Sequence, residues 1–136
     1  MKIEDQVLSI EQIKELQELG FDVIKNSSAI VIIKENGTFI VDKEMVEKNI
    51  FGITNKIEDM FYSMTIGDII NILPVKIEED YSVKIEEDYF LSVNLEYCAY
   101  SMVGGVDTIF FTREKELINN LFNTLVWCIK QKYIEI

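Results

Sequence analysis

The sequence predicts an α+β fold: an antiparallel sheet of about four to six strands, with an N-terminal helix, a middle helix and a long C-terminal helix packed on one face. Three observations support this class. Three stretches repeat apolar residues at helical spacing, the runs between them are β-branched or alternating, and turn residues separate those runs. A chain of 136 residues, 49% of them hydrophobic, is expected to form a single domain over residues 1–136.

The N-terminal helix is predicted over residues 10–19. Ser9 and Gln12 have the spacing of a capping box, in which each side chain satisfies a backbone group of the other residue. Gly20 suits the left-handed position that often follows a helix. The apolar residues recur at helical spacing, at Ile10, Ile13, Leu16 and Leu19.

A β-hairpin is predicted next. Residues 29–34 form a β-branched run too short for a helix, and residues 38–41 return after Asn36 and Gly37, a pair that suits a type I′ turn. The secondary structure of residues 42–64 has more than one interpretation. They can form a short helix that ends at Asn49 or a loop, followed by a further turn or strand.

The middle helix is predicted to begin after Thr65, its candidate N-cap, and to end at Pro74. Asp68 lies in the first turn, where a negative charge is favourable. The apolar stripe of this helix comprises Ile66, Ile69, Ile70 and Leu73.

Residues 75–90 contain a tandem repeat, VKIEEDYS followed by VKIEEDYF. Its even period keeps every later strand residue on its original face. Glu79 and Glu87 fall on the apolar side of the alternation, so turns or a projecting ribbon are expected here rather than a continuous strand. Deletion of residues 75–82 is therefore expected to change the stability little. A strand is predicted over residues 89–97.

A second hairpin and the C-terminal helix complete the fold. Residues 98–103 and 106–112 flank Gly104-Gly105, a dipeptide typical of tight turns. Thr112 is the expected N-cap of the helix. Its apolar face comprises Leu117, Ile118, Leu121, Phe122, Leu125, Val126, Cys128 and Ile129. Trp127 points to the opposite, polar face, beside Asn120.

The net charge of the chain indicates which classes of partner it can bind. A net charge of −11 repels nucleic acid and anionic membranes, and it favours a protein partner with a basic surface. No apolar run reaches the length of a membrane span, and acids stand where a signal peptide has its apolar core. A cytoplasmic location is therefore expected, and Cys98 and Cys128 are interpreted as buried thiols rather than a disulfide.

The sequence contains no histidine, which removes catalytic sites that need imidazole and most transition-metal sites. Two distant cysteines lack the further ligands of a zinc site, and Gly104-Gly105 precedes a strand, unlike phosphate-binding loops. No catalytic residue, metal or cofactor is expected. An enzyme that uses carboxylates, with or without a divalent metal, is the least favoured alternative.

Seven residues are candidates for partner binding. Six are the acids of the two repeat copies, Glu78, Glu79, Asp80, Glu86, Glu87 and Asp88, which would attract a basic surface. Their ordinary interpretation is a solvated turn that prevents edge-to-edge strand pairing. The seventh is Trp127, a candidate anchor for a partner or for self-association. The alternative is that the loop after the first helix, or residues 42–64, covers this ring, because tryptophan is seldom fully exposed.

Three segments resemble a family of small uncharacterised proteins from bacteriophages, prophages and other mobile elements of gut-type bacteria. They are LSIEQ with the following LQELG (residues 8–20), TIGDIINILP (65–74) and LVWCIKQKYI (125–134). The resemblance implies a phage or mobile-element origin and carries over no catalytic motif. Its members have one short link where this sequence has the duplicated octapeptide.

These observations predict a non-enzymatic protein–protein interaction module. Its most specific form is an acidic inhibitor that docks on a basic surface of a host nucleic-acid-binding defence complex, as anti-CRISPR-like proteins do. The alternative is a structural or accessory protein that acts as a homo-oligomer, with Trp127 or an exposed strand edge in the interface.

Overall fold

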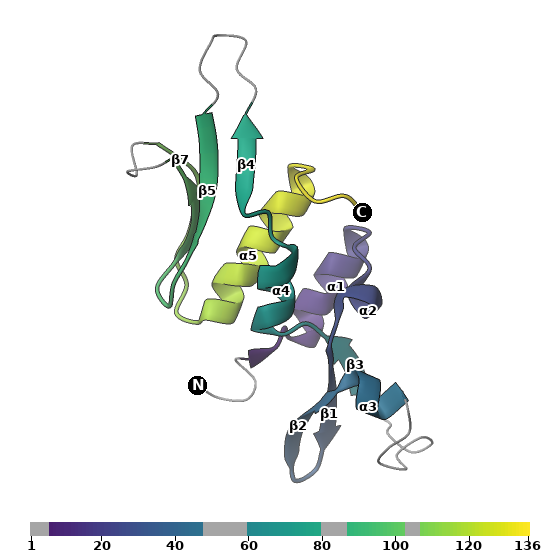
Figure 1. Ribbon diagram of the computed structural model, residues 1–136. Coiled ribbons are helices and arrows are strands. Elements are labelled where there is room, and N and C mark those ends of the chain that lie inside the picture. Colours follow the sequence, from purple (N-terminus) through teal and green to yellow (C-terminus); the bar gives the residue numbers. More distant parts are fainter. Residues whose placement is uncertain (1–5, 48–59, 80–86, 103–106) are drawn as a thin grey trace. The chain divides into compact units, whose positions relative to one another are not determined.

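The computed structural model describes residues 6–47, 60–79, 87–102 and 107–136 (Figure 1). The chain divides into two compact units, Met1–Asn71 with Ile136, and Ile72–Glu135. Helices and antiparallel strands make up both units, which confirms the α+β class. The strands form two sheets, of three and four strands, where the sequence predicts one sheet of four to six. A single domain over residues 1–136 stays a prediction.

The first unit contains a three-stranded sheet in the order β2–β1–β3. Its elements are α1 (Ile10–Glu18), α2 (Val23–Asn26), β1 (Ala29–Lys34), β2 (Gly37–Asp42), α3 (Lys43–Glu47), β3 (Met60–Ser63) and α4 (Ile66–Ile72), the last of which ends just past the sequence boundary of the unit. The apolar run of β1 is central, and its first four residues are buried. On one face of this sheet, Val31 packs with Val7 and Ala29, beside Ile40 and Phe61.

The predicted helix starts in this unit are confirmed. Ser9 and Gln12 form the capping box of α1, in which each backbone N–H donates to the other side chain, at 3.0 and 3.2 Å. Gly20 follows α1 with a φ of +86°. Thr65 and Asp68 make the same reciprocal pair at the start of α4, at 2.9 and 3.1 Å. Both helices therefore begin where a side chain replaces a missing backbone partner.

The β1–β2 hairpin is confirmed, but its type I′ turn is wrong. Lys34 pairs with Gly37, so Glu35 and Asn36 are the turn residues. Among the described residues other than glycine, Lys132 alone has a positive φ, so Asn36 does not adopt the conformation that a type I′ turn requires. Between residues 42 and 64, α3 and β3 confirm the helix and strand alternatives for the part that is described.

The second unit contains a four-stranded sheet in the order β4–β5–β6–β7, with α5 packed on β6 and β7 (Figure 1). Its elements are β4 (Lys76–Glu79), β5 (Glu87–Val93), β6 (Cys98–Ser101), β7 (Thr108–Thr112) and α5 (Leu117–Lys130). The hairpin that the sequence predicts around Gly104-Gly105 is confirmed in its strands, and those two glycines lie outside the described residues.

Residues 76–79 of the first repeat copy form the edge strand β4, so Glu78 and Glu79 lie in a strand where the sequence predicts a turn or a projecting ribbon. The rest of that prediction falls on residues 80–86, which lie outside the described residues. β4 pairs with β5 from Lys76 opposite Phe90 to Glu79 opposite Glu87. Ile77 is buried, opposite the fully buried Tyr89. Because β4 adds a buried side chain and a ladder of backbone hydrogen bonds, its removal should lower the stability of the unit.

The helix α5 begins later than predicted. Thr112 ends β7, and Glu116 is the N-cap residue, without a side-chain hydrogen bond to the helix. The predicted apolar face is buried at Ile118, Leu121, Phe122, Leu125, Cys128 and Ile129. Asn120, which the helical wheel places on the polar side, is also buried, together with Thr124. The buried arc of α5 is therefore wider than its apolar residues indicate.

Candidate protein-binding face

The four-stranded sheet has an inner face, on which α5 packs, and an opposite face, here named the outer face. Tyr100 and Phe110 are opposite one another on the inner face, with ring centroids 5.6 and 4.7 Å from that of Trp127. Side chains alternate along each strand, so the residues next to them point the other way. The outer face therefore carries Lys76, Glu78, Asp88, Phe90, Ser92, Ala99, Ser101 and Phe111.

Aromatic side chains of β5, of the edge strand β7 and of the turn before β6 lie on the outer face. Phe111 is 55% exposed and Phe90 is 38% exposed. The Tyr97 ring, two residues before Ala99 and on the same face, lies 5.3 Å from the Phe111 ring between centroids. Ala99 is opposite Phe111 in the ladder and is buried. Exposed aromatic rings around a small buried residue are typical of surfaces that contact other proteins.

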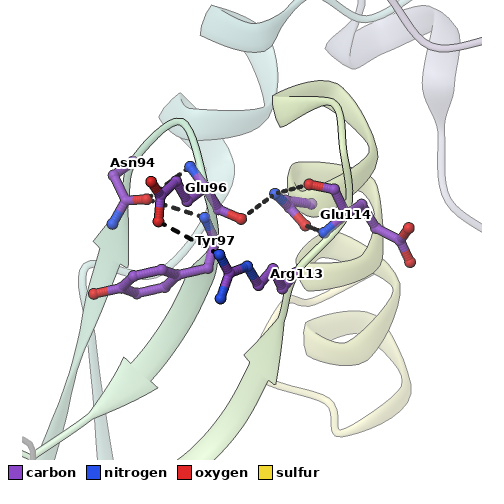
Figure 2. Close-up of polar contacts among 6 residues, drawn as sticks. Asn94, Glu96, Tyr97, Arg113 and Glu114 are labelled. Atoms are coloured by element: carbon purple, nitrogen blue, oxygen red, sulfur yellow. Dashed lines mark hydrogen bonds and ion pairs between the residues drawn. The ribbon is translucent and has the colours of Figure 1, made fainter.

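The turn between β5 and β6 positions Tyr97 (Figure 2). The Asn94 side chain accepts hydrogen bonds from the backbone N–H groups of Glu96, at 2.8 Å, and of Tyr97, at 3.0 Å. The Asn94 N–H donates to the Tyr97 carbonyl at 3.1 Å. Arg113, just after β7, approaches the Glu96 carboxylate to 3.7 Å (Figure 2). This exposed ion pair adds about 1 kcal/mol at most, so the asparagine is the main local constraint.

The Asn120 side chain, on α5, forms hydrogen bonds with backbone groups at the same end of the sheet. Its side-chain oxygen accepts a hydrogen bond from the Glu114 N–H at 2.6 Å. Its amide group donates to the carbonyls of Glu96, at 3.3 Å, and Glu114, at 3.4 Å. One buried side chain of α5 thus joins the β5–β6 turn to the segment between β7 and α5.

An acidic edge borders the outer face at β4. Glu78 and Asp88 are opposite one another, and the Lys76 Nζ lies 3.0 Å from Glu78 Oε1 and 3.7 Å from Asp88 Oδ2. The hydrogen bond to Glu78 and the negative charges of both carboxylates raise the pKa of Lys76, which stays charged. Two carboxylates share one ammonium, so this edge keeps a net negative charge.

Of the four other acids of the repeat, the structure describes two. Glu79 and Glu87 are opposite one another at the end of the β4–β5 ladder. Asp80 and Glu86 lie outside the described residues. The β4–β5 ladder therefore pairs residues of the first repeat copy with residues of the second. The even period of the repeat is compatible with this pairing.

Trp127 is packed within the second unit, and its expected place on a polar helix face is wrong. Its ring stacks on Phe110 at an interplanar angle of 27° and lies 5.3 Å from the Tyr133 ring between centroids. Together with Tyr100, these contacts come from β6, β7 and the segment after α5. Trp127 is half-buried, so only part of its ring is available to a partner.

The two thiols are suited to a structural role. Cys98 and Cys128 are buried and unpaired with one another, as the sequence predicts. Burial raises the pKa of Cys128 to about 11 and also raises that of Cys98. The Cys128 thiol donates to the Tyr100 hydroxyl at 3.6 Å, which in turn donates to the Pro74 carbonyl at 2.7 Å. Protonated thiols are weak nucleophiles and weak metal ligands at neutral pH.

No group of three or more described Asp, Glu or Cys side chains is placed to hold a metal ion. No helix in the described part of the chain is both long and apolar enough to cross a membrane.

The aromatic residues of the outer face, Phe90, Tyr97 and Phe111, are absent from the residues that the sequence predicts for binding. A signal was present, because Phe90 falls among the polar positions of the alternating run, and Phe110 and Phe111 are adjacent, so one of them must face outward. Asn120 gave no such signal, because its partners are backbone groups of Glu114 and of Glu96, the second of which is 24 residues away in the sequence.

Comparison of the chain with protein-family models, with curated proteins and with solved structures gives no match. The resemblance to phage and mobile-element proteins therefore stays a prediction, and the outer face is the basis on which a function can be inferred.

Proposed function

We propose that the chain is a non-enzymatic protein–protein interaction module whose outer face binds a partner with a basic surface. One observation carries this proposal. The exposed rings of Phe90 and Phe111 and the half-buried ring of Tyr97 share a face with the acidic edge formed by Glu78 and Asp88.

The two parts of this face have different physical roles. Aromatic rings contribute most of the contact energy at protein interfaces, because they bury a large area at a low cost in conformational entropy. Carboxylates at the border steer a basic partner and exclude acidic ones, and they contribute more to the association rate than to affinity. The net charge of −11 extends this steering beyond the contact itself.

The more specific form of the proposal follows from the resemblance and the charge together. It is a cytoplasmic inhibitor of phage or mobile-element origin that occupies the nucleic-acid-binding surface of a host defence complex. Such a surface is basic, and it combines cationic side chains with apolar or aromatic ones that stack on bases. The outer face is complementary to it in both respects.

The test is binding of the purified chain to purified host nucleic-acid-binding defence complexes, one at a time, by surface plasmon resonance at low and high salt. Phe111→Ala should weaken binding about 10- to 100-fold, as expected for the most exposed aromatic ring of this face. The double variant Glu78→Gln, Asp88→Asn should slow association and flatten the dependence on salt.

The matched control is Ile24→Ala, an exposed apolar residue of α2 in the first unit. It should leave binding unchanged. The proposal fails if no complex binds at low ionic strength, or if Phe111→Ala binds as tightly as the unaltered chain.

A further inference from the structure

The end of the outer face at the β5–β6 turn combines two aromatic rings with one carboxylate. The rings of Tyr97 and Phe111 form a tilted pair, with centroids 5.3 Å apart and 32° between their planes. Figure 2 shows the Glu96 carboxylate and the Tyr97 ring on the side of the turn that points away from α5. A side chain of another protein can therefore meet an aromatic surface and a negative charge at the same end of the face.

The backbone of Glu96 is fixed by two hydrogen bonds. Its N–H donates to the Asn94 side chain at 2.8 Å, and its carbonyl accepts from the Asn120 amide at 3.3 Å. Neither bond uses the carboxylate, and the Glu96 side chain is 74% exposed. The turn therefore presents this negative charge on a backbone that needs no further ordering when a partner binds.

A guanidinium of the chain itself already approaches this carboxylate. Arg113, which directly follows β7, places its Nη2 atom 3.7 Å from Glu96 Oε2, beyond the range of a hydrogen bond. The Arg113 side chain is 67% exposed. A long ion pair between two exposed side chains is weak, so a better placed guanidinium can displace this one.

The faces of the two rings are free of cations within the described ranges. There, the cations that lie over a ring are Lys34, 6.0 Å from the centroid of Phe39, and Lys43, 5.8 Å from that of Tyr62, both in the first unit. Arg113 thus pairs with Glu96 without stacking on the neighbouring rings. The stacking position at this end of the outer face is not used by the described part of the chain.

We infer that this end of the outer face binds an arginine side chain of the basic partner. The guanidinium stacks on the Tyr97–Phe111 pair and takes the place of Arg113 beside Glu96. A guanidinium suits this site because it is planar, stacks on aromatic rings and forms parallel hydrogen bonds with a carboxylate. The ammonium of lysine is compact and strongly hydrated, so it gains less from the rings. The inference rests on the proposed function for the kind of partner.

Hexa-arginine and hexalysine peptides test this preference. They carry the same side-chain charge, so the acidic edge at β4 attracts both to a similar degree. Each peptide is titrated into the purified chain, and NMR follows the ring resonances of Tyr97 and Phe111. Hexa-arginine should shift these resonances and bind about 2- to 5-fold more tightly than hexalysine, as expected for a cation–π contact at an exposed site.

Two variants remove one part of the site each. Phe111→Leu keeps an apolar side chain without a π system, and Glu96→Gln removes the carboxylate, so both should abolish the preference for arginine. Glu114→Gln is the matched control for the second variant, because it loses the same charge and its carboxylate points away from Tyr97 (Figure 2). It should weaken binding of both peptides equally and leave the preference unchanged.

Arg113→Gln should give a gain of binding. Without the competing guanidinium, hexa-arginine should bind about 2- to 5-fold more tightly, and its advantage over hexalysine should increase. Lys115→Gln is the matched control, because Lys115 is exposed and its loss changes the net charge equally. It should strengthen binding of both peptides by the same, smaller factor.

Three results overturn the inference: equal binding of the two peptides at the rings, a preference for arginine that survives in Phe111→Leu or Glu96→Gln, or no gain in Arg113→Gln beyond that in Lys115→Gln. The proposed function still stands in these cases if Phe111→Ala weakens binding to a host complex. If no host complex binds while the peptides show the full expected pattern, the proposed function fails and the arginine site is retained.

Discussion

Replacement of Asn120 by alanine should destabilise the second unit by about 2–4 kcal/mol. Asn120 is fully buried, and its side chain contacts backbone groups of two segments that are far apart in the sequence. Without it, the end of the sheet that presents Tyr97 loses its connection to α5.

The magnitude follows from the three hydrogen bonds. The 2.6 Å bond from the Glu114 N–H is short, and loss of its acceptor leaves a partly buried donor unsatisfied, at a cost of about 1–3 kcal/mol. The bonds to the carbonyls of Glu96 and Glu114 are longer, at 3.3 and 3.4 Å, and should add about 1 kcal/mol together. The alanine variant is therefore expected near the middle of the range.

Urea unfolding followed by tryptophan fluorescence measures this cost. Trp127 is the only tryptophan of the chain and lies in the same helix as Asn120, so its emission reports on the second unit. Asn123→Ala is the matched control. Its amide donates to the Thr112 hydroxyl at 2.9 Å, at a half-buried position, and its loss should cost about 1 kcal/mol.

A second substitution, Asn120→Asp, makes the effect depend on pH. The new carboxyl keeps the shape of the amide and the acceptor for Glu114, but it places an oxygen against two carbonyl oxygens. Burial and these oxygens should raise its pKa above the unfolded value of about 4, so the proton is held more tightly in the folded state. Relative to the unaltered chain, stability should be nearly preserved below pH 4 and should fall as pH rises through the raised pKa.

The reasoning is refuted if Asn120→Ala costs no more than Asn123→Ala. It is also refuted if Asn120→Asp is equally stable, relative to the unaltered chain, at pH 3 and pH 7. Either result would mean that the backbone groups around Glu114 find other partners when this side chain changes.

Three further predictions concern the core of the second unit. Leu121→Ala should cost about 2–5 kcal/mol in urea unfolding, because Leu121 is fully buried, and a cost near zero would contradict its place in the core. Deletion of residues 75–82 should leave a folded chain that is less stable by about 2–4 kcal/mol, because the remaining copy cannot form both β4 and the start of β5; unchanged stability would mean that β4 and the buried Ile77 contribute nothing. Burial raises the pKa of Cys128 to about 11, so the unfolded chain loses this proton first and stability should fall by up to about 2 kcal/mol between about pH 9 and pH 11. Cys128→Ala should show a smaller fall over that range, and an equal fall would assign the titration to other groups.

Local signals were sufficient for the starts of α1 and α4 and for the paired strands of the two hairpins, whereas the short helix α2 was not predicted. The capping boxes at Ser9 and Thr65 form hydrogen bonds between residues three apart, so a few consecutive residues are enough to predict them. The alternating and β-branched runs likewise predicted the paired strands. The start of α5 was misplaced because Thr112 is an acceptable cap by residue type, yet β6 pairs with it, opposite Cys98, and the helix begins only after Glu116.

What the sequence did not predict depends on contacts between distant residues. The division of strands into two sheets is set by which runs pair, and pairing has no local signature. Burial of Asn120 requires the carbonyl of Glu96, which is 24 positions away. In the same way, Phe90 and Phe111 can be assigned to one face only once Ala99 is placed between Ser92 and Phe111.

The near-identity of the two octapeptides has a consequence for how the protein can vary. A slip between the two copies during replication removes or adds eight residues in one event, and the even number leaves the in-and-out phase of β5 intact. The event changes the margin of the sheet at β4, whereas Tyr97 and Phe111 lie toward the opposite margin. Each such event can therefore change the length of the negatively charged border by one eight-residue unit, while the aromatic pair Tyr97 and Phe111 is unchanged.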